Sequence, residues 1–571
     1  MMAHDPWLEI RERADAVRRE IETRLGVATP APIVDAPEDK GAFALAAFGY
    51  AKALRRSPAD IAKEAATVPA PAPFLALRAD GGYVNFVLDP AAFAARVLAS
   101  TQEMGESYGQ SPVRPERVLL EHTSANPTGP LHVGRARNPI YGDALARTMR
   151  LAGYRVTTEY LVNDVGKQMV LQYWGTKRLT SQDVGPAERE KDDYRTVKFY
   201  QRATALMEGD PKVNGEVMAL IQRFERGDAA LTREVREVSE GVLRGILETL
   251  ARIGVSYDSF FWESDLILDG SVRRVIDRLG GMSQEEDGAR FLDLSEFGLE
   301  GDAAKYVFVT KLGTSLYTTR DIAYHLKKME RCDVGINVLG EDQKLTFSRL
   351  KAALRLMGIP WAPETIFYAF VGLPEGRLST RKGRVVYLDD LLDEAVDRAY
   401  EEVRKRREDL SEERMREIAE LVGVSAVRYN IARVQAEKRI LFRWEEALSF
   451  EGSSAPFIQY SHARACGILE KAGALRKGDP ALLVALAEQR LLRWIARFPS
   501  AVREAAETRR VHAIATFAAD FAGVFNEFYR DCPVLTAAPE LREARLALVD
   551  AARIVLQNAL SSLGLKAPKE M

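Results

Sequence analysis

The feature that most constrains the fold is a polar loop at residues 121–142, EHTSANPTGPLHVGRARNPIYG, which follows the short apolar run 118–120. An apolar run, then a loop rich in Ser, Asn, Pro and Gly, then a helical pattern predict a strand, a loop and a helix. A second apolar run at 154–162 follows, so the unit is βαβ and its sheet is parallel. Sheets of this kind bind ligands at the carboxyl ends of their strands.

The tripeptide His132-Val133-Gly134 stands where the helix of this unit begins. Free backbone N–H groups and the positive end of a helix dipole make this a site for an anion. His132 adds a side-chain donor, and Gly134 lacks the Cβ that would keep a flat ring away from the backbone. The segment therefore predicts a nucleoside triphosphate site. An ordinary turn with a structural histidine is the alternative, and the loop and the following strand argue against it.

Composition sets wide limits on the function. The chain has 571 residues, of which 28% are charged and 47% hydrophobic, as expected for about three or four globular domains. No apolar run approaches the ~20 residues that span a bilayer, and the N-terminus lacks a signal-peptide core. Cys332, Cys466 and Cys532 are scattered, so neither a disulfide framework nor a metal site is expected, and the compartment predicted is the cytoplasm. A net charge of −2 leaves nucleic-acid binding open.

The chain divides into three predicted parts. Residues 1–110 form an α+β domain with a hairpin at Gly81-Gly82. Residues 111–396 form a Rossmann-like α/β domain with a mostly helical insert at about 167–302. Its strands are expected at 118–121, 155–162, 305–309, 316–318, 335–339 and 365–371. Residues 397–571 carry no convincing strand and form an all-α bundle of about five or six helices, whose boundaries are expected at Pro456, Pro480, Pro499 and Pro533.

The polar loop resembles the HIGH-type signature of class I aminoacyl-tRNA synthetases, and its longer form is similar to arginyl-tRNA synthetases in particular. A second segment, RLSTRKG at 377–383, resembles the mobile KMSKS-type loop of the same class. Two positions depart from the usual pattern: Arg135 replaces a second histidine, and Thr380 replaces the second lysine. The resemblance implies catalytic roles and ATP contacts for the following residues: His132, Gly134, Arg135, Ser379, Arg381 and Lys382.

The segment SLYTTRDIAYH matches the substrate pocket of the same family. Tyr317 and Asp321 are four residues apart, which puts them on one face if the helix has begun. The resemblance implies that Asp321 binds a guanidinium and that Tyr317 contacts the substrate. Further pocket positions are matched by Glu121, Ser124, Asn126 and Gln343. The alternative is structural: Asp321 caps a helix and Glu121 pairs with a neighbouring arginine.

The C-terminal bundle is similar to the anticodon-binding domain of arginyl-tRNA synthetases, and the N-terminal domain to the one that touches the elbow of tRNA. Aromatic side chains that stack on unpaired bases are the usual way of reading single-stranded RNA. The predicted tRNA contacts are Phe457, Tyr460, Tyr529 and Met571. Core packing is the competing interpretation for each aromatic residue, because most aromatics at helical spacing are buried.

Together these resemblances imply a ligase that joins L-arginine to tRNA(Arg) through an arginyl-adenylate. ATP is expected as a substrate, together with Mg²⁺, and no tightly bound cofactor or membrane partner is expected. A cytoplasmic monomer is expected, and arginine activation is expected to require bound tRNA. A non-catalytic tRNA- or arginine-binding paralogue is the alternative, supported by Arg135 and Thr380. A nucleotidyltransferase without an RNA substrate would leave the helical bundle unexplained.

Overall fold

The computed structural model describes residues 5–309, 316–372, 386–474 and 476–571. Ser379, Arg381 and Lys382, predicted for the second signature loop, lie outside these ranges, and for Tyr317 only the backbone is described. Within the described ranges, no helix has the length and apolar character needed to cross a membrane.

The N-terminal unit is an antiparallel sheet covered by helices. Its four strands have the order β1-β2-β4-β3, and Gly81, with φ of 56°, makes the tight turn of the predicted hairpin between β3 and β4. Asp89 caps α4 by accepting from the N–H groups of Ala91 and Ala92. The elements are α1 (Pro6–Leu25), β1 (Ile33–Asp35), β2 (Phe43–Ala46), α2 (Phe48–Leu54), α3 (Pro58–Ala65), β3 (Phe74–Asp80), β4 (Tyr83–Leu88), α4 (Pro90–Met104) and η1 (Gly105–Ser107).

The central sheet has five parallel strands in the order β12-β11-β5-β6-β7. The chain runs from β5 through η2 and α5 to β6 on one side, and β11 pairs with β5 on the other. The strand order therefore reverses between β5 and β11, the place where such sheets bind ligands. The elements are β5 (Arg117–Glu121), η2 (Val133–Arg135), α5 (Arg137–Leu151), β6 (Arg155–Val162), β7 (Ser259–Trp262), α13 (Tyr317–Arg331), β11 (Val334–Gly340), η5 (Glu341–Gln343), α14 (Lys344–Leu356), β12 (Glu364–Tyr368) and β13 (Val371–Gly372).

Two expected strands of this sheet are absent from it. The prediction of a strand at 316–318 is wrong, because α13 begins at Tyr317. Thr318 and Thr319 have high strand propensity, but their hydroxyls bond the carbonyls of Val307 and Phe308 and fix the start of the helix instead. The strand at Lys305–Val309 exists as β10 but belongs to a separate antiparallel sheet of order β10-β9-β8.

The segment between β6 and β10 is helical only in its first part. Its elements are α6 (Lys167–Arg178), α7 (Ser181–Val184), α8 (Asp192–Gly209), α9 (Pro211–Glu225), α10 (Ala229–Arg252), β7, α11 (Asp265–Leu268), α12 (Ser271–Gly280), β8 (Gln284–Glu286), β9 (Ala289–Asp293), η3 (Ser295–Phe297), η4 (Gly301–Ala303) and β10 (Lys305–Val309). β7 joins the edge of the central sheet, which the sequence analysis did not foresee.

The C-terminal part is a helical bundle with one short strand, β14, which pairs with β13 and was not predicted. Pro499 does not end a helix as expected but lies inside α19. Proline at 499 removes the N–H that would bond the carbonyl of Ile495, and the Tyr108 hydroxyl donates to that carbonyl at 3.0 Å instead. The elements are α15 (Leu388–Arg406), α16 (Glu412–Ala432), β14 (Ile440–Leu441), α17 (Trp444–Ala447), α18 (Ala455–Ala472), η6 (Pro480–Leu482), α19 (Leu486–Glu507), α20 (Val511–Asp531) and α21 (Pro539–Ser562).

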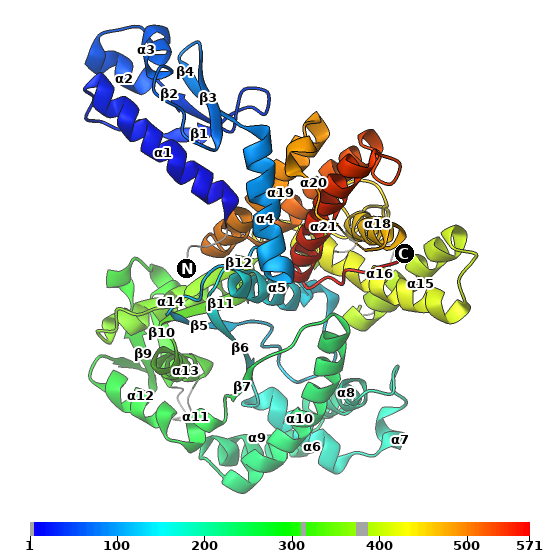
Figure 1. Ribbon diagram of the computed structural model, residues 1–571. Helices are drawn as coiled ribbons and strands as arrows, with labels where there is room; N and C mark the ends of the chain where they lie inside the picture. The colour runs from blue at the N-terminus through cyan, green and yellow to red at the C-terminus, as the bar shows by residue number, and fades with distance from the viewer. Residues whose placement is uncertain (1–4, 310–315, 373–385, 475) are drawn as a thin grey trace.

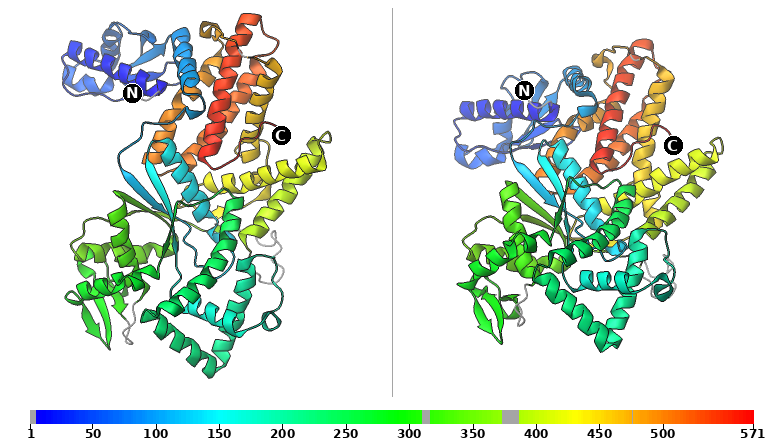
Figure 2. Two further views of the ribbon diagram at one scale, coloured as in Figure 1. Left: turned by 60° about the horizontal axis from the view of Figure 1, so that its bottom comes forward. Right: turned by 90° about the horizontal axis from the view of Figure 1, so that it is seen from below.

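The N-terminal unit and the bundle lie on the same side of the central sheet. The N-terminal unit stands beside the bundle, where α1 and α4 pack on α19, and away from the central sheet (Figure 1). Helices α6 to α10 extend from the opposite side of that sheet, as the two turned views in Figure 2 also show. The carboxyl edge of the sheet thus lies between the insert and the bundle.

Candidate functional site

A cavity of about 330 Å³ opens at the carboxyl ends of β5 and β11, where the strand order reverses. The cavity wall brings together six residues that the sequence analysis placed in the site: Glu121, Ser124, Asn126, Arg135, Asp321 and Gln343. These residues come from β5, the loop after it, η2, α13 and η5. Side chains separated by more than 200 positions therefore face one space.

The loop after β5 is held in a strained conformation. Thr123 and Ser124 have φ of 70° and 40°, a region that L side chains rarely adopt. The surroundings fix this geometry: Asn138 accepts from the Thr123 N–H at 2.6 Å, and the Ser124 hydroxyl donates to Glu121 at 3.1 Å. Consecutive strained residues are typical of ligand sites, where the rest of the fold compensates for them.

His132 is exposed at the start of η2 and does not line the cavity. Its Nδ1 accepts from the Gly134 N–H at 3.0 Å, so the proton of the neutral ring is on Nε2, which can donate outward. A Cβ at residue 134 would stand 2.9 Å from that Nδ1, which explains the glycine. Partial burial and the positive charge of Arg135 lower the pKa of His132, which keeps the ring neutral.

The first signature also forms backbone hydrogen bonds with residues 386–388, which follow the second signature in the chain. The Val133 N–H donates to Val386 at 3.0 Å, and the Leu388 N–H donates to Leu131 at 2.7 Å. The insert contacts both segments: the Tyr194 ring packs edge-on against Tyr387, with 5.2 Å between ring centres. A Cβ on Gly129 would stand 2.8 Å from Val197. Helix α8 thus contacts both the first signature and the residues that follow the second one.

Asp321 is half-buried in the cavity wall, and no hydrogen bond or ion pair to its carboxylate is found among the described residues. Burial raises the pKa of Asp321 to about 7, and the negative charges of Glu263 and Glu121 act in the same direction. A carboxylate in this position lacks only a cation. A guanidinium supplies a permanent charge and several donors in one plane.

Glu121 is buried and already has a cation. The Lys328 ammonium, which is fully buried, donates to Glu121 at 2.9 Å. Burial opposes ionisation of this carboxyl, but the Lys328 charge holds the pKa of Glu121 below its ordinary value. The structural alternative considered for Glu121, pairing with a neighbouring cation, is therefore realised, with a lysine in place of an arginine.

Tyr324 and His325 line the cavity and were not predicted. They follow Asp321 at helical spacings of three and four, and Lys328, which bonds Glu121, follows at seven, a signal that was present in the sequence. Glu263 does not line the cavity, but its negative charge acts on Asp321; its carboxylate accepts from Arg320 at 2.6 Å through one oxygen, while the other is buried without a partner among the described residues. Nothing in the sequence marked Glu263, because β7 was not predicted.

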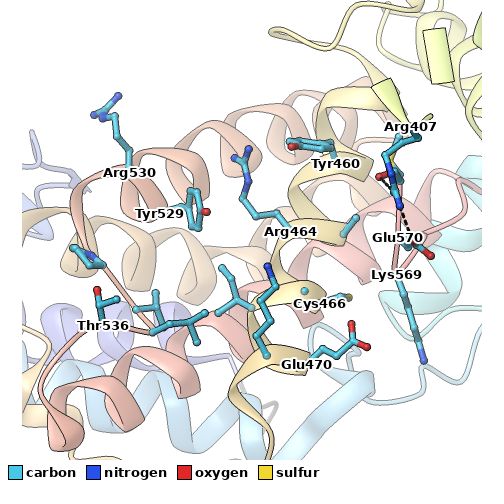
Figure 3. Close-up of a pocket in the computed structure, with 18 of the residues that line it drawn as sticks. Arg407, Tyr460, Arg464, Cys466, Glu470, Tyr529, Arg530, Thr536, Lys569 and Glu570 are labelled. Atoms are coloured by element: carbon cyan, nitrogen blue, oxygen red, sulfur yellow. Dashed lines mark hydrogen bonds and ion pairs between the residues drawn. The ribbon is translucent and has the colours of Figure 1, made fainter. Parts of the chain in front are cut away.

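A larger cavity of about 1,320 Å³ lies in the bundle between α18, α20 and the C-terminus. Tyr460, Tyr529 and Met571 line it, and the Arg464 guanidinium lies between the two tyrosine rings, 4.7 Å from each centre (Figure 3). Phe457 does not line this cavity and packs against the core of the bundle instead. Further cations on its wall are Arg407, Arg414, Lys471, Arg530 and Lys569.

Comparisons with known proteins agree with this layout. Residues 97–444 match the family described as "tRNA synthetases class I (R), catalytic domain", and residues 458–571 match the "DALR anticodon binding domain". The chain is 47% identical to the arginine–tRNA ligase of Methanocella arvoryzae over 92% of each chain. It is 44% identical to that of Methanothermobacter thermautotrophicus over 98% of this chain and 99% of that one.

Among solved structures, the arginyl-tRNA synthetase of Thermus thermophilus superposes with a TM-score of 0.80 and 30% identity, covering 98% of this chain and all of that one. Both the catalytic sheet with its cavity and the helical bundle thus have counterparts in one family. The chain belongs to the arginyl-tRNA synthetases, the class I ligases that use ATP to join arginine to its tRNA.

Proposed function

We propose that L-arginine binds in the cavity at the β5–β11 edge with its guanidinium against Asp321. The main support for this proposal is the Asp321 carboxylate, which faces the cavity and has no cation bound to it among the described residues. Glu121, on the same cavity wall, is proposed as a second acceptor for this planar group, as the sequence analysis expected. Tyr317, four residues before Asp321, is proposed to contact the substrate side chain.

The other end of the amino acid is assigned to the polar residues of the same wall. We propose that Asn126, Ser124 and Gln343 bind the α-amino and carboxyl groups, which leaves the carboxylate directed toward the first signature. Activation requires that this carboxylate attack the α-phosphate of ATP, with pyrophosphate leaving. No covalent bond to the protein is needed, so alignment and charge stabilisation supply the catalysis.

The ATP phosphates are assigned to the first signature. We propose that Nε2 of His132 and the Arg135 guanidinium donate to them, and that Gly134 lets the nucleotide approach the backbone. Ser379, Arg381 and Lys382 are proposed to complete the phosphate site from the second signature. Mg²⁺ is proposed to arrive with the phosphates, where it would neutralise charge on the leaving pyrophosphate.

We propose that the bundle reads the anticodon in the larger cavity through Tyr460, Tyr529 and Met571. The rings are already spaced to hold a flat group, since Arg464 lies between them (Figure 3). The cations on the wall suit the phosphate backbone. Phe457 is the weakest of the predicted contacts, because it packs against the core.

The remaining assignments concern the molecule as a whole. We propose a cytoplasmic monomer whose N-terminal unit, residues 1–110, contacts the elbow of tRNA while residues 397–571 bind its anticodon. A single chain carries both the small cavity and the larger one, which supports action as a monomer.

The test is ATP–pyrophosphate exchange measured with each of the twenty amino acids, with and without tRNA. Exchange is expected with arginine in the presence of tRNA and to be negligible in its absence. Vigorous exchange without tRNA would overturn the proposed tRNA dependence, and exchange driven by another amino acid would overturn the assignment of the cavity to arginine.

A further inference from the structure

The loop after β5 places Thr123, Ser124 and Asn126 on the wall of the proposed arginine pocket. Thr123 and Ser124 both have positive φ, which is especially unfavourable for threonine because its side chain branches at Cβ. Contacts from the rest of the fold must therefore hold the loop. Two of them come from α5 and β6: the Thr123 N–H donates to Asn138, and the Leu161 N–H donates to the Ser124 hydroxyl at 3.1 Å.

Two tyrosine hydroxyls hold the same loop from outside the pocket. The Tyr257 hydroxyl donates to Oγ1 of Thr123 at 2.5 Å, and the Tyr160 hydroxyl donates to the carbonyl of Ala125 at 2.8 Å. Neither tyrosine is among the described residues that line the cavity. The two rings meet edge to face with 5.2 Å between their centres, so one aromatic pair supports both bonds.

Tyr257 lies in the short connection between α10 of the insert and β7, and its neighbour fixes that connection. The Asp258 carboxylate accepts from the Thr158 N–H at 2.7 Å and from Arg150 at 2.6 Å. The Asp258 N–H donates to the Thr158 carbonyl at 3.0 Å. The hydroxyl of Tyr257 therefore reaches the loop from a fixed point that is 134 positions from Thr123 in the chain.

His122 completes the contact between the loop and Tyr257. Its ring is buried, packs against the Tyr257 ring with 4.7 Å between centres, and has Nδ1 3.1 Å from Oγ1 of Thr123. A Cβ on Gly142 would stand 2.3 Å from the His122 ring, so α5 closes the other side. Burial lowers the pKa of His122 to about 4, which keeps the packed ring uncharged. The loop is thus fixed from α5 on one side and from Tyr257 on the other.

We propose that Tyr257 is a positioning residue for arginine, whose hydroxyl keeps the loop in its strained conformation so that Ser124 and Asn126 face the α-amino and carboxyl groups of the substrate. This rests on the proposed arginine pocket. Without the bond from Tyr257, the loop relaxes toward ordinary φ values and the two polar side chains move away from the amino acid. The guanidinium end is bound at Asp321 on α13 and is unaffected.

The experiment measures tRNA charging by Tyr257→Phe and Tyr160→Phe, which each remove one hydroxyl and keep the ring. KM and kcat are determined for arginine and for ATP. Inhibition by butylguanidine is measured as well, because this compound carries the guanidinium but lacks the α-amino and carboxyl groups. The matched control is Tyr429→Phe, since the Tyr429 hydroxyl also donates to a backbone carbonyl, that of Ala515 in the bundle, at 3.0 Å. Melting temperatures are recorded for every variant.

In Tyr257→Phe the KM for arginine should rise about 5-fold, the effect of losing one neutral hydrogen bond of average strength. Tyr160→Phe should act in the same direction, because it releases the same loop. The KM for ATP and the inhibition constant of butylguanidine should change less than about twofold, since neither ligand is bound by the loop. Tyr429→Phe should leave all these constants at their wild-type values.

Thr123→Gly separates the proposed bond from a general effect of the tyrosine. Glycine removes both the hydroxyl that Tyr257 bonds and the Cβ that makes positive φ unfavourable. Adding Tyr257→Phe to Thr123→Gly should therefore change the KM for arginine less than about twofold, because the bond no longer exists. If Tyr257→Phe has its full effect in that background, the hydroxyl acts somewhere other than on the loop, and the inference is overturned.

An unchanged KM for arginine in Tyr257→Phe, or equal effects on arginine and butylguanidine, would also overturn the inference. Failure of the pocket itself is distinguished by Asp321→Asn in the same assay. If Asp321→Asn charges arginine normally, the pocket and this inference fall together. An impaired Asp321→Asn beside a normal Tyr257→Phe overturns this inference alone.

Discussion

At the scale of single residues, the geometry of the first signature explains both its histidine and its glycine. The Gly134 N–H fixes the imidazole of His132 as a donor through Nε2, and the glycine leaves room for that ring. The side chain is thus oriented before any ligand arrives. Because such donors are already oriented, little energy is needed to reorganise them when charge develops on a phosphate.

His132→Ala is expected to lower kcat for tRNA charging by about 10²- to 10³-fold, the usual cost of removing one such donor, with a smaller effect on the KM for arginine. The matched control is His512→Ala, on α20 of the bundle, which should change kcat less than about threefold by the same reasoning. Steady-state kinetics decide. Equal losses in the two variants would remove His132 from the phosphate site.

Asp321 provides a pH test. Its pKa is raised to about 7 by burial and by nearby acids, and only the ionised form attracts a guanidinium. The KM for arginine should therefore fall as pH rises from 6 to about 7 and level off above, by up to about 10-fold per pH unit below the pKa. The effect on stability has the opposite sign. The free energy of unfolding of the arginine-free protein should fall as pH rises from 6 to about 7, because the folded protein holds the Asp321 proton more tightly than the unfolded chain does. A flat KM for arginine between pH 6 and 8 contradicts this account, with the KM for ATP as the reference.

At the scale of elements, the insert holds the helix that follows the second signature. Arg189 donates to Asp390 at 2.7 Å and to Asp393 at 2.6 Å, and Lys191 donates to Asp389 at 2.9 Å. These acids lie in the first two turns of α15. The start of α15 is therefore fixed from the insert on one side and from the first signature on the other.

Arg189→Ala should lower kcat about 10-fold, because it removes two charge-assisted bonds worth roughly 1.5–3 kcal/mol each before solvent screening. The KM for arginine should change little, since the cavity wall is untouched. Arg195→Ala is the control: that guanidinium is exposed and bonds only Glu190 and Asp192 of the insert among the described residues. If both variants behave alike, the insert does not position α15.

Elements with a strong local signal were predicted well. The unit of β5, α5 and β6, the hairpin of β3 and β4, and most helices of the bundle are where apolar periodicity and turn residues put them. The failures have tertiary causes. Thr318 is helical because its hydroxyl bonds Val307, and Pro499 is tolerated because Tyr108 satisfies the carbonyl it frees. Neither partner could be found from local sequence.

The candidate site was likewise predicted where local motifs mark it and missed where it depends on residues distant in the chain. Motif resemblance brought Glu121, Asp321 and Gln343 together correctly on one cavity wall. It did not reveal that Glu121 is already paired, because Lys328 stands 207 positions away in the chain. Glu263 depends on β7, a strand too short to be distinguished within a charged helical segment.

At the scale of the whole molecule, two cavities lie far apart on one chain, one at the sheet edge and one in the bundle. The bundle cavity combines aromatic rings with cations, which suits single-stranded RNA. A ligand that engages both cavities must be extended, as tRNA is.

Tyr529→Ala should raise the KM for tRNA about 10- to 100-fold, because base stacking on an aromatic side chain contributes roughly 1–3 kcal/mol. The KM for arginine and for ATP should stay within about twofold, since the ring is remote from the sheet. Phe457→Leu is the informative comparison: this ring packs against the core, so the tRNA KM should barely change. The reverse ranking would show that the anticodon contact had been assigned to the wrong ring.

The central claim is that the Asp321 carboxylate determines the specificity of this enzyme for arginine. The most direct test compares the charging of tRNA with labelled arginine by the wild type and by Asp321→Asn. The asparagine keeps the shape of the side chain and removes its charge. We expect a loss of at least about 10³-fold in kcat/KM for arginine, with the KM for ATP nearly unchanged, because a polar site left unpaired rejects its ligand strongly. Arginine charging by Asp321→Asn at close to the wild-type rate would contradict the account.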